Sequence, residues 1–255
     1  MFTIFDWFGY NLPIKERYRL IKQAGFDGVM LYWSDEFGDA DYKSFPQYAK
    51  EHGLYVENIH TSFENINSIW LDNQDGKGIE DYLLQCVDDC ITYEIPTMVV
   101  HLSSGDNPPP MNIFGLDRIK RVAEKAEKHK VNVALENLRN SESLAYVFEK
   151  IELQHIGFCY DSGHHNCRNP KEDLLKKYGS RLMALHLHDN DGTDDQHRLP
   201  LEGTIDWNKT MQSISQTNYS GAIALEVINR EYEKMSAEGF LSVAFERAKK
   251  LENLL

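Results

Sequence analysis

The chain has 255 residues, of which 42% are hydrophobic and 26% are charged, with a formal net charge of −13 at pH 7. These values are typical of a soluble globular protein, and the negative charge disfavours non-specific binding to nucleic acid or anionic membranes. The four cysteines form no C-x-x-C pair, so no disulfide framework is indicated. No secretory leader or membrane-length apolar run is recognisable, so we expect a cytoplasmic protein.

Short apolar, strand-like runs alternate with stretches of helical periodicity along the whole chain. Strands are expected at 2–8, 27–32, 54–60, 97–102, 131–136, 156–160, 182–187 and 221–227. Helices are expected at 13–24, 41–52, 77–94, 113–129, 141–150, 170–179, 206–217 and 235–252. No linker divides the chain, and the strand runs lack strict alternation, as in parallel strands covered on both faces. The pattern predicts an α/β protein, a single (β/α)8 TIM barrel over residues 1–255.

Six consecutive runs end in, or next to, a side chain that can bind a metal. These side chains are His60, His101, Glu136, Asp161, His186 and Glu226. The C-terminal ends of barrel strands converge on one mouth, so three histidines and three carboxylates are expected in one pocket.

Four of these residues form the strongest group. They are Glu136, Asp161, His186 and Glu226, on the four last strands. Each alone could simply cap a strand end, but four at matched ends favour a metal site. This oxygen-rich set suits a divalent ion, Zn²⁺ or Mn²⁺ first and Mg²⁺ or Co²⁺ next, rather than copper or an iron–sulfur cluster.

Further candidates lie in the loops. His164 follows Asp161 by three residues, and a tight turn there would bring both side chains to one site. Asp195 and His197 alternate in an extended segment of the long 188–205 connection, so they would point to the same side. Each could instead be a solvated loop residue. His188 abuts Asp189 in a turn and is expected to be structural or to contact a ligand residue.

Aromatic side chains lie at or just beyond the first three strands. They are Tyr10, Tyr32, Trp33 and Phe63. Aromatic residues at this position could wall a small-ligand pocket or merely pack the rim, and the sequence leaves both interpretations open.

Several strings resemble the xylose isomerase-like TIM barrel superfamily, which contains sugar isomerases and epimerases, inosose dehydratases and the abasic-site endonuclease IV. The strings are Ala134-Leu135-Glu136-Asn137, Asp161-Ser162-Gly163-His164, Leu185-His186-Leu187-His188-Asp189-Asn190, His197 to Trp207 and Ala224-Leu225-Glu226-Val227. They cover the second half of the chain, and their order and spacing are specific although each alone is weak.

The resemblance implies a divalent metal held by Glu136, Asp161, His186 and Glu226. It also implies isomerisation or epimerisation of a small carbohydrate, such as a sugar, sugar acid or polyol-derived ketone, through an enediolate. In this reading Glu136 and Glu226 are the catalytic acid and base, and His164 contacts a substrate hydroxyl. Relatives are often dimers or tetramers, which leaves a homo-oligomer open.

A second reading is a multi-zinc phosphoesterase resembling endonuclease IV, which holds three Zn²⁺ ions with nine ligands. Counterparts of all nine can be named: His60, His101, Glu136, Asp161, His164, His186, Asp195, His197 and Glu226. The acidic charge opposes a duplex-DNA partner. A third reading is a barrel that binds sugar and metal without turnover. Gly192 stands where the ketohexose 3-epimerases carry a substrate-binding arginine, which argues against that particular specificity.

Overall fold

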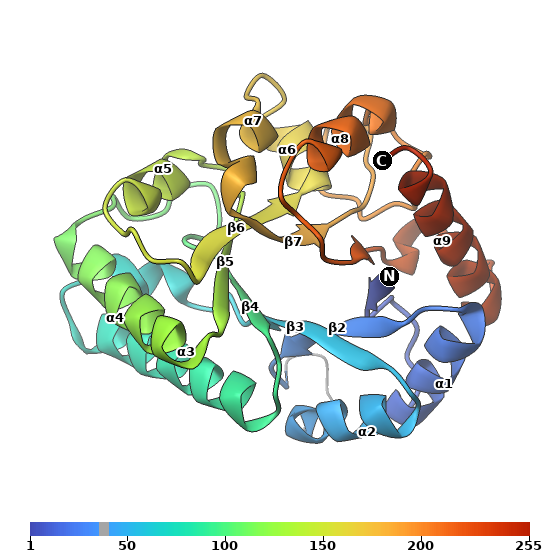
Figure 1. Cartoon of the computed structure of the whole chain (residues 1–255), viewed down its shortest axis with the longest axis horizontal. Helices are drawn as coiled ribbons and strands as arrows, with labels where there is room; N and C mark the ends of the chain where they lie inside the picture. Colours follow the sequence, from blue (N-terminus) through green and yellow to red (C-terminus); the bar gives the residue numbers. More distant parts are fainter. Residues whose placement is uncertain (36–40) are drawn as a thin grey trace.

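The computed structural model describes residues 1–35 and 41–255, and within them eight parallel strands follow one another around a barrel (Figure 1). Their bounds are β1 Phe2–Phe5, β2 Gly28–Trp33, β3 Tyr55–Thr61, β4 Thr97–Val100, β5 Asn132–Glu136, β6 Ile156–Asp161, β7 Leu182–His186 and β8 Ile223–Leu225. The barrel closes through a parallel bridge between Leu187 and Leu225, in which the Leu187 amide donates to the Ala224 carbonyl at 2.9 Å. The predicted (β/α)8 TIM barrel is confirmed.

Helices surround the strands on the outside of the barrel (Figure 1). Their bounds are α1 Ile14–Ala24, α2 Phe45–Glu51, α3 Gln74–Thr92, α4 Ile113–His129, α5 Glu142–Phe148, α6 Ser162–Arg168, α7 Leu174–Tyr178, α8 Trp207–Ser215 and α9 Ala237–Glu252. Helix α4 shows why they form. The Asn112 side chain accepts from the Phe114 and Gly115 amides, and Lys130 ends the helix in the left-handed conformation. None of the helices in the described part of the chain has the length and apolarity needed to cross a membrane.

The sequence prediction missed helix α6. A tight turn was expected after Asp161, and a helix only at 170–179, where α7 is shorter. The Asp161 carboxylate accepts a hydrogen bond from the His164 amide at 2.7 Å and so caps a helix that starts directly at the strand end. Residues three apart on a helix lie on one side, so the expected closeness of Asp161 and His164 holds for a different reason.

Three strands are shorter than their predicted runs by two residues or more. β1 ends at Phe5 rather than at residue 8, β4 ends at Val100, and β8 covers Ile223–Leu225 instead of 221–227. The extra apolar residues are buried outside the sheet: Phe8 and Val227 are fully buried, and Phe8 stacks on Phe240 of α9. An apolar run in the sequence indicates buried residues, and here the buried residues extend beyond the part of the chain that pairs in the sheet.

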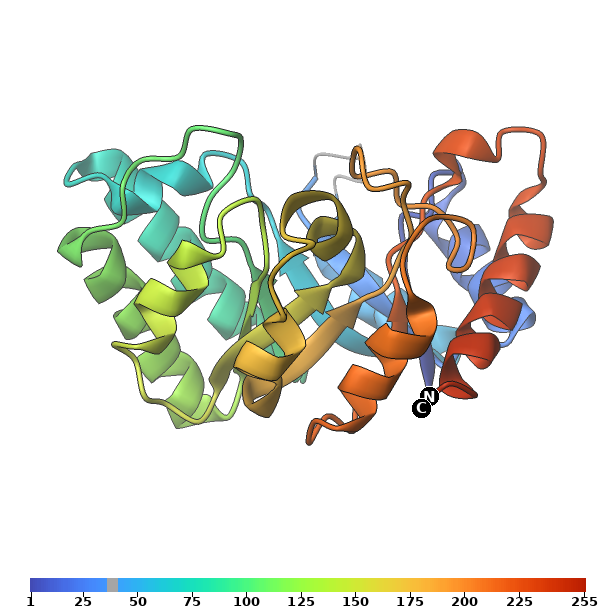
Figure 2. The ribbon, with the colours of Figure 1, turned by 90° about the horizontal axis from the view of Figure 1, so that it is seen from above.

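The long connection between β7 and α8, residues 187–206, lies at the end of the barrel opposite to the two chain termini (Figure 2). This is the end to which the parallel strands point. The loops that follow the strands therefore gather at this mouth, as the barrel architecture requires.

Candidate metal centre in the barrel mouth

The interior of the barrel explains why the polar residues meet. Small apolar side chains form a separate cluster inside it: Val99, Ala134, Cys159 and Ala184, from β4 to β7. Side chains two residues apart on a strand share a face. The next inward positions toward the mouth are therefore those of His101, Glu136, Asp161 and His186, which gives the strands a polar upper layer.

Four side chains of this layer come close enough to share one ion. Ligand atoms of Glu136, Asp161, His186 and Glu226 all lie within 4.8 Å of one another. The Nδ1 atom of His186 lies 3.4 Å from a Glu136 oxygen and 3.5 Å from a Glu226 oxygen. It is buried and has no hydrogen-bond partner among the described residues. Ligands bound at about 2.0–2.2 Å stand at comparable separations, so the donor set fits a divalent cation.

Three buried carboxyl groups in one place are electrostatically costly without a cation. Burial, and then the charges of Glu136 and Asp161, raise the pKa of Glu226 well above its usual value. Burial also opposes ionisation of Glu136, but His101 and His186 hold its pKa well below its usual range. Positive charge next to these carboxyl groups is therefore favourable, whether it comes from the histidines or from a bound cation.

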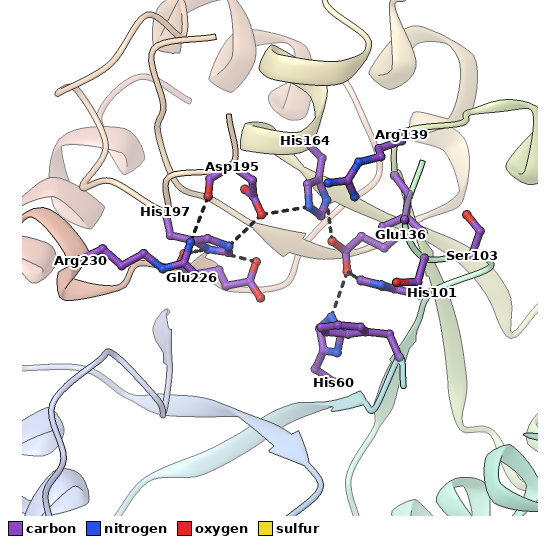
Figure 3. Close-up of a pocket in the computed structure, with 14 residues that line it drawn as sticks. His60, His101, Ser103, Glu136, Arg139, His164, Asp195, His197, Glu226 and Arg230 are labelled. Atoms are coloured by element: carbon purple, nitrogen blue, oxygen red, sulfur yellow. Dashed lines mark hydrogen bonds and ion pairs between the residues drawn. The ribbon is translucent and has the colours of Figure 1, made fainter. Parts of the chain in front are cut away.

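His60 and His101 flank Glu136 on the side of β3 and β4. Their Nε2 atoms lie 3.2 and 3.1 Å from the same Glu136 oxygen, while His164 Nδ1 lies 3.0 Å from the other oxygen (Figure 3). His60 Nδ1 lies 2.9 Å from the Thr61 carbonyl, to which it must donate. If the ring is neutral, the His60 Nε2 atom carries a lone pair that faces the Glu136 carboxylate. A cation between this nitrogen and the carboxylate would stabilise the arrangement.

A second group continues from Asp161 toward the long loop. Asp195 lies 3.4 Å from His164 and 3.1 Å from His197, measured from its Oδ2 atom to their Nε2 atoms. His197 Nδ1 lies 2.8 Å from the Glu226 carbonyl and must donate to it, so its Nε2 also faces a carboxylate. The segment is not simply extended as predicted, because His197 has a φ of +50°. This turn brings the two side chains together.

His188 contacts Asp161, which agrees with one of the two roles expected from the sequence. Its Nε2 atom lies 3.1 Å from Asp161, and its ring stacks on His197 with centroids 4.2 Å apart. Burial lowers its pKa, but the charges of Asp161 and Asp195 and the hydrogen bond to Asp161 together raise it. His188 therefore helps to hold the Asp161 carboxylate in its position.

A cavity of about 270 Å³ opens above these residues. Phe63 lines it and stacks on His101, with ring centroids 4.9 Å apart, and Tyr32 stacks on His60. Trp33 and Tyr10 face elsewhere: Trp33 donates to Asp89, and Tyr10 donates to the Met235 carbonyl. Of these aromatic residues, Phe63 therefore forms part of the cavity wall, Tyr32 packs against His60 behind it, and Trp33 and Tyr10 pack elsewhere.

Sequence reasoning missed several polar residues on the cavity wall. They are Ser103, Ser104, Arg139 and Arg230. All four lie beyond the strand ends, three in loops and Arg230 in a short 3-10 turn, where no periodic pattern marks the direction of a side chain. The only signal available was their position a few residues after a strand-end ligand.

Fold and site together define a (β/α)8 barrel with a histidine–carboxylate centre in its mouth. The family model described as xylose isomerase-like TIM barrel matches residues 18–247, and the chain belongs to this family. Protein y4fM of Sinorhizobium fredii is 26% identical, over 96% of this chain and 91% of that protein. Inosose isomerase of Bacillus velezensis is 21% identical, over 92% and 91%. A structure described as the IOLI protein with a binding zinc atom superposes with a TM-score of 0.75 at 18% identity, over 99% and 96%.

Proposed function

We propose that the protein is a divalent-metal-dependent isomerase or epimerase of a small carbohydrate. The observation that carries the proposal is the convergence of Glu136, Asp161, His186 and Glu226 within 4.8 Å in a buried site. The similarity to an inosose isomerase and to a zinc-binding barrel supports it. Zn²⁺ or Mn²⁺ is the expected ion, with Mg²⁺ or Co²⁺ as alternatives.

The metal would be held by these four residues. When bound, it would act as a Lewis acid that polarises a carbonyl group and stabilises negative charge on oxygen. The rest of the reaction belongs to the side chains of the chain itself, which have to bind the sugar and move one proton.

Two glutamates carry the proton transfer in this proposal. Glu136 comes from β5 and Glu226 follows β8, and they approach the cavity from different sides (Figure 3). One carboxylate takes the proton from the carbon next to the carbonyl, and the C–H electron pair enters the enediolate. The other returns a proton to carbon and so yields the isomer or epimer. His164, at 3.4 Å from Asp195, would hold a substrate hydroxyl.

Exchange of substrate hydrogen with solvent tests this assignment. In deuterated water, a panel of ketoses and sugar acids should show metal-dependent incorporation of deuterium at one carbon. Glu226→Gln should lower the exchange rate by about 10²–10⁴-fold, the usual contribution of a positioned acid or base. Glu231→Gln is a matched control, because Glu231 is an exposed partner of Arg198. Unchanged exchange in Glu226→Gln would refute the role of Glu226.

A multi-zinc phosphoesterase is the second candidate, and one observation favours it. His60 and His197 are not among the four residues of the centre. When their rings are neutral, the Nε2 lone pair of His60 faces Glu136 at 3.2 Å and that of His197 faces Asp195 at 3.1 Å. Two further ions would satisfy both contacts. Incubation with a duplex containing an abasic site tests this candidate: metal-dependent cleavage would favour it over the isomerase. A barrel that binds sugar and metal without exchange or cleavage would be a sensor.

A further inference from the structure

Two arginines give the rim of the cavity a positive charge. Arg139 follows β5, and Arg230 lies in a short 3-10 turn, Asn229–Glu231, after β8. They stand on opposite sides of the metal centre, Arg139 beside His164 and Arg230 beside Glu226 (Figure 3). Of the described residues that line the cavity, no other is a lysine or arginine.

Positive charge at this place is notable in a chain with a net charge of −13. Several other arginines are neutralised by carboxylates: Arg121 pairs with Glu80 at 2.5 Å, and Arg198 pairs with Glu231 at 2.8 Å. No carboxylate of residues 1–35 and 41–255 lies within ion-pair distance of Arg230, whose Nη1 donates to the Asp195 carbonyl at 3.3 Å. The overall negative field would repel an anionic ligand, and the rim arginines counter that field locally.

Arg139 has a partner that an incoming anion can replace. Its Nε atom lies 2.8 Å from Asp106, whose side chain is 81% exposed. An ion pair this exposed contributes little to stability, because water screens it and both side chains lose freedom. A carboxylate or phosphate bound within the cavity would exchange for Asp106 at small cost.

The segment before Asp106 completes the wall next to Arg139. Ser103, Ser104 and Gly105 line the cavity, and the Arg139–Asp106 contact holds the guanidinium close to them. Gly105 has a φ of +73°, a conformation that favours glycine, and a Cβ added there would meet no atom within 4 Å. The segment thus offers hydroxyl groups and open space beside a guanidinium, which together suit a charged oxygen group.

We propose that the carbohydrate substrate carries an anionic group, a carboxylate or a phosphate, that binds between Arg139 and the Ser103–Gly105 segment. This inference rests on the proposed isomerase function and specifies its substrate class. The metal centre would hold the reacting end of the sugar, while Arg139 fixes the charged end. Arg230 adds positive charge across the mouth and favours the approach of the anion.

Matched substrates test the proposal. A neutral ketohexose, its terminal phosphate ester and a ketohexonate are compared by deuterium exchange, so that phosphate and carboxylate are distinguished. We expect one of the two anionic ketoses to have the highest kcat/KM. Arg139→Gln should raise the KM for that substrate about tenfold or more while kcat stays close to the original, the loss expected for a charge-assisted hydrogen bond. KM for the neutral ketose should not change.

Arg19→Gln is the control, because it removes the same charge from an exposed pair with Glu16 on α1. Equal use of neutral and anionic ketoses, or an unchanged KM in Arg139→Gln, would overturn the inference while the isomerase proposal stands.

If no ketose shows deuterium exchange, the isomerase proposal is refuted. The anion site is then tested separately, by measuring the binding of anions. Inorganic phosphate and glycolate are titrated by calorimetry into the full chain stripped of metal. Arg139→Gln should weaken the binding of at least one of them about tenfold relative to Arg19→Gln. If both variants bind phosphate and glycolate equally well, the proposed anion site next to Arg139 is refuted.

Discussion

Gly163 lies directly against the ring of His188: a Cβ built on Gly163 would fall 1.9 Å from the His188 Cε1 atom. No side chain fits in that space. The contact joins the first turn of α6 to the loop after β7, and His188 in turn contacts Asp161 at 3.1 Å. The absence of a side chain at residue 163 is therefore a condition for the position of the Asp161 carboxylate, a proposed metal ligand.

Gly163→Ala should weaken metal binding. The added methyl group forces the His188 ring or the start of α6 to move, and either movement disturbs Asp161. Loss of such a supporting contact typically costs about 10–100-fold in metal affinity. Competition with a chromogenic zinc chelator measures the dissociation constant.

Gly78→Ala is the matched control for this experiment. Gly78 lies in α3, where an added Cβ would meet nothing within 4 Å, so alanine should stabilise the helix by about 0.5–1 kcal/mol. Its metal affinity should equal that of the original chain. Equal affinities in the two glycine variants would contradict the supporting role of His188.

The sequence could predict the strands and the polar residues at their ends for one physical reason. Both are local signals, since an apolar run followed by Glu136 or His186 reports a buried strand that ends at a polar mouth. The contact of Gly163 with His188 and the rim position of Arg139 depend on how loops pass one another, which no local period encodes. Helix α6 was missed because it is short and its capping residue, Asp161, was interpreted only as a ligand.

Metal content distinguishes the two enzyme candidates. After loading with Zn²⁺ or Mn²⁺ and removal of excess ions, elemental analysis should give one ion per chain if the four-residue centre is the resident site. Asp161→Asn should lose most of this metal, because the Asp161 carboxylate is one of the four groups whose ligand atoms lie within 4.8 Å of one another. Asp195→Asn should retain it, since Asp195 is outside that group. Three ions per chain, with a loss in Asp195→Asn, would instead favour the phosphoesterase.

Metal should also stabilise the fold. A ligand that binds only the folded chain raises the free energy of unfolding, by about 4 kcal/mol at a thousandfold excess over its dissociation constant. We therefore expect a chelator to lower the melting temperature of the loaded protein. The same treatment should leave Asp161→Asn nearly unaffected. An equal effect on both proteins would mean that the stabilising ion binds at another place.

Glu57 gives the protein a pH dependence that is separate from the metal centre. It is the extra residue of a bulge in β3, because Val29 pairs with Val56 and Met30 pairs with Asn58. Its carboxyl group accepts hydrogen bonds from Thr3 and Tyr219 near the starts of β1 and β8. Burial nevertheless raises its pKa from 4.5 to about 7.

The folded chain therefore keeps a proton on Glu57 at pH values where the unfolded chain has released it. Stability falls as the pH rises through the window from about 4.5 to 7 and then levels off, since the folded state binds more protons. Glu57→Gln keeps an oxygen acceptor without the charge. It should raise the free energy of unfolding above pH 7 by about 1–3 kcal/mol and flatten the slope below it. Urea unfolding between about pH 5 and 8 measures both effects, with Glu51→Gln as control because the Glu51 side chain on α2 is exposed. A slope unchanged by Glu57→Gln would show that another group carries the pH dependence.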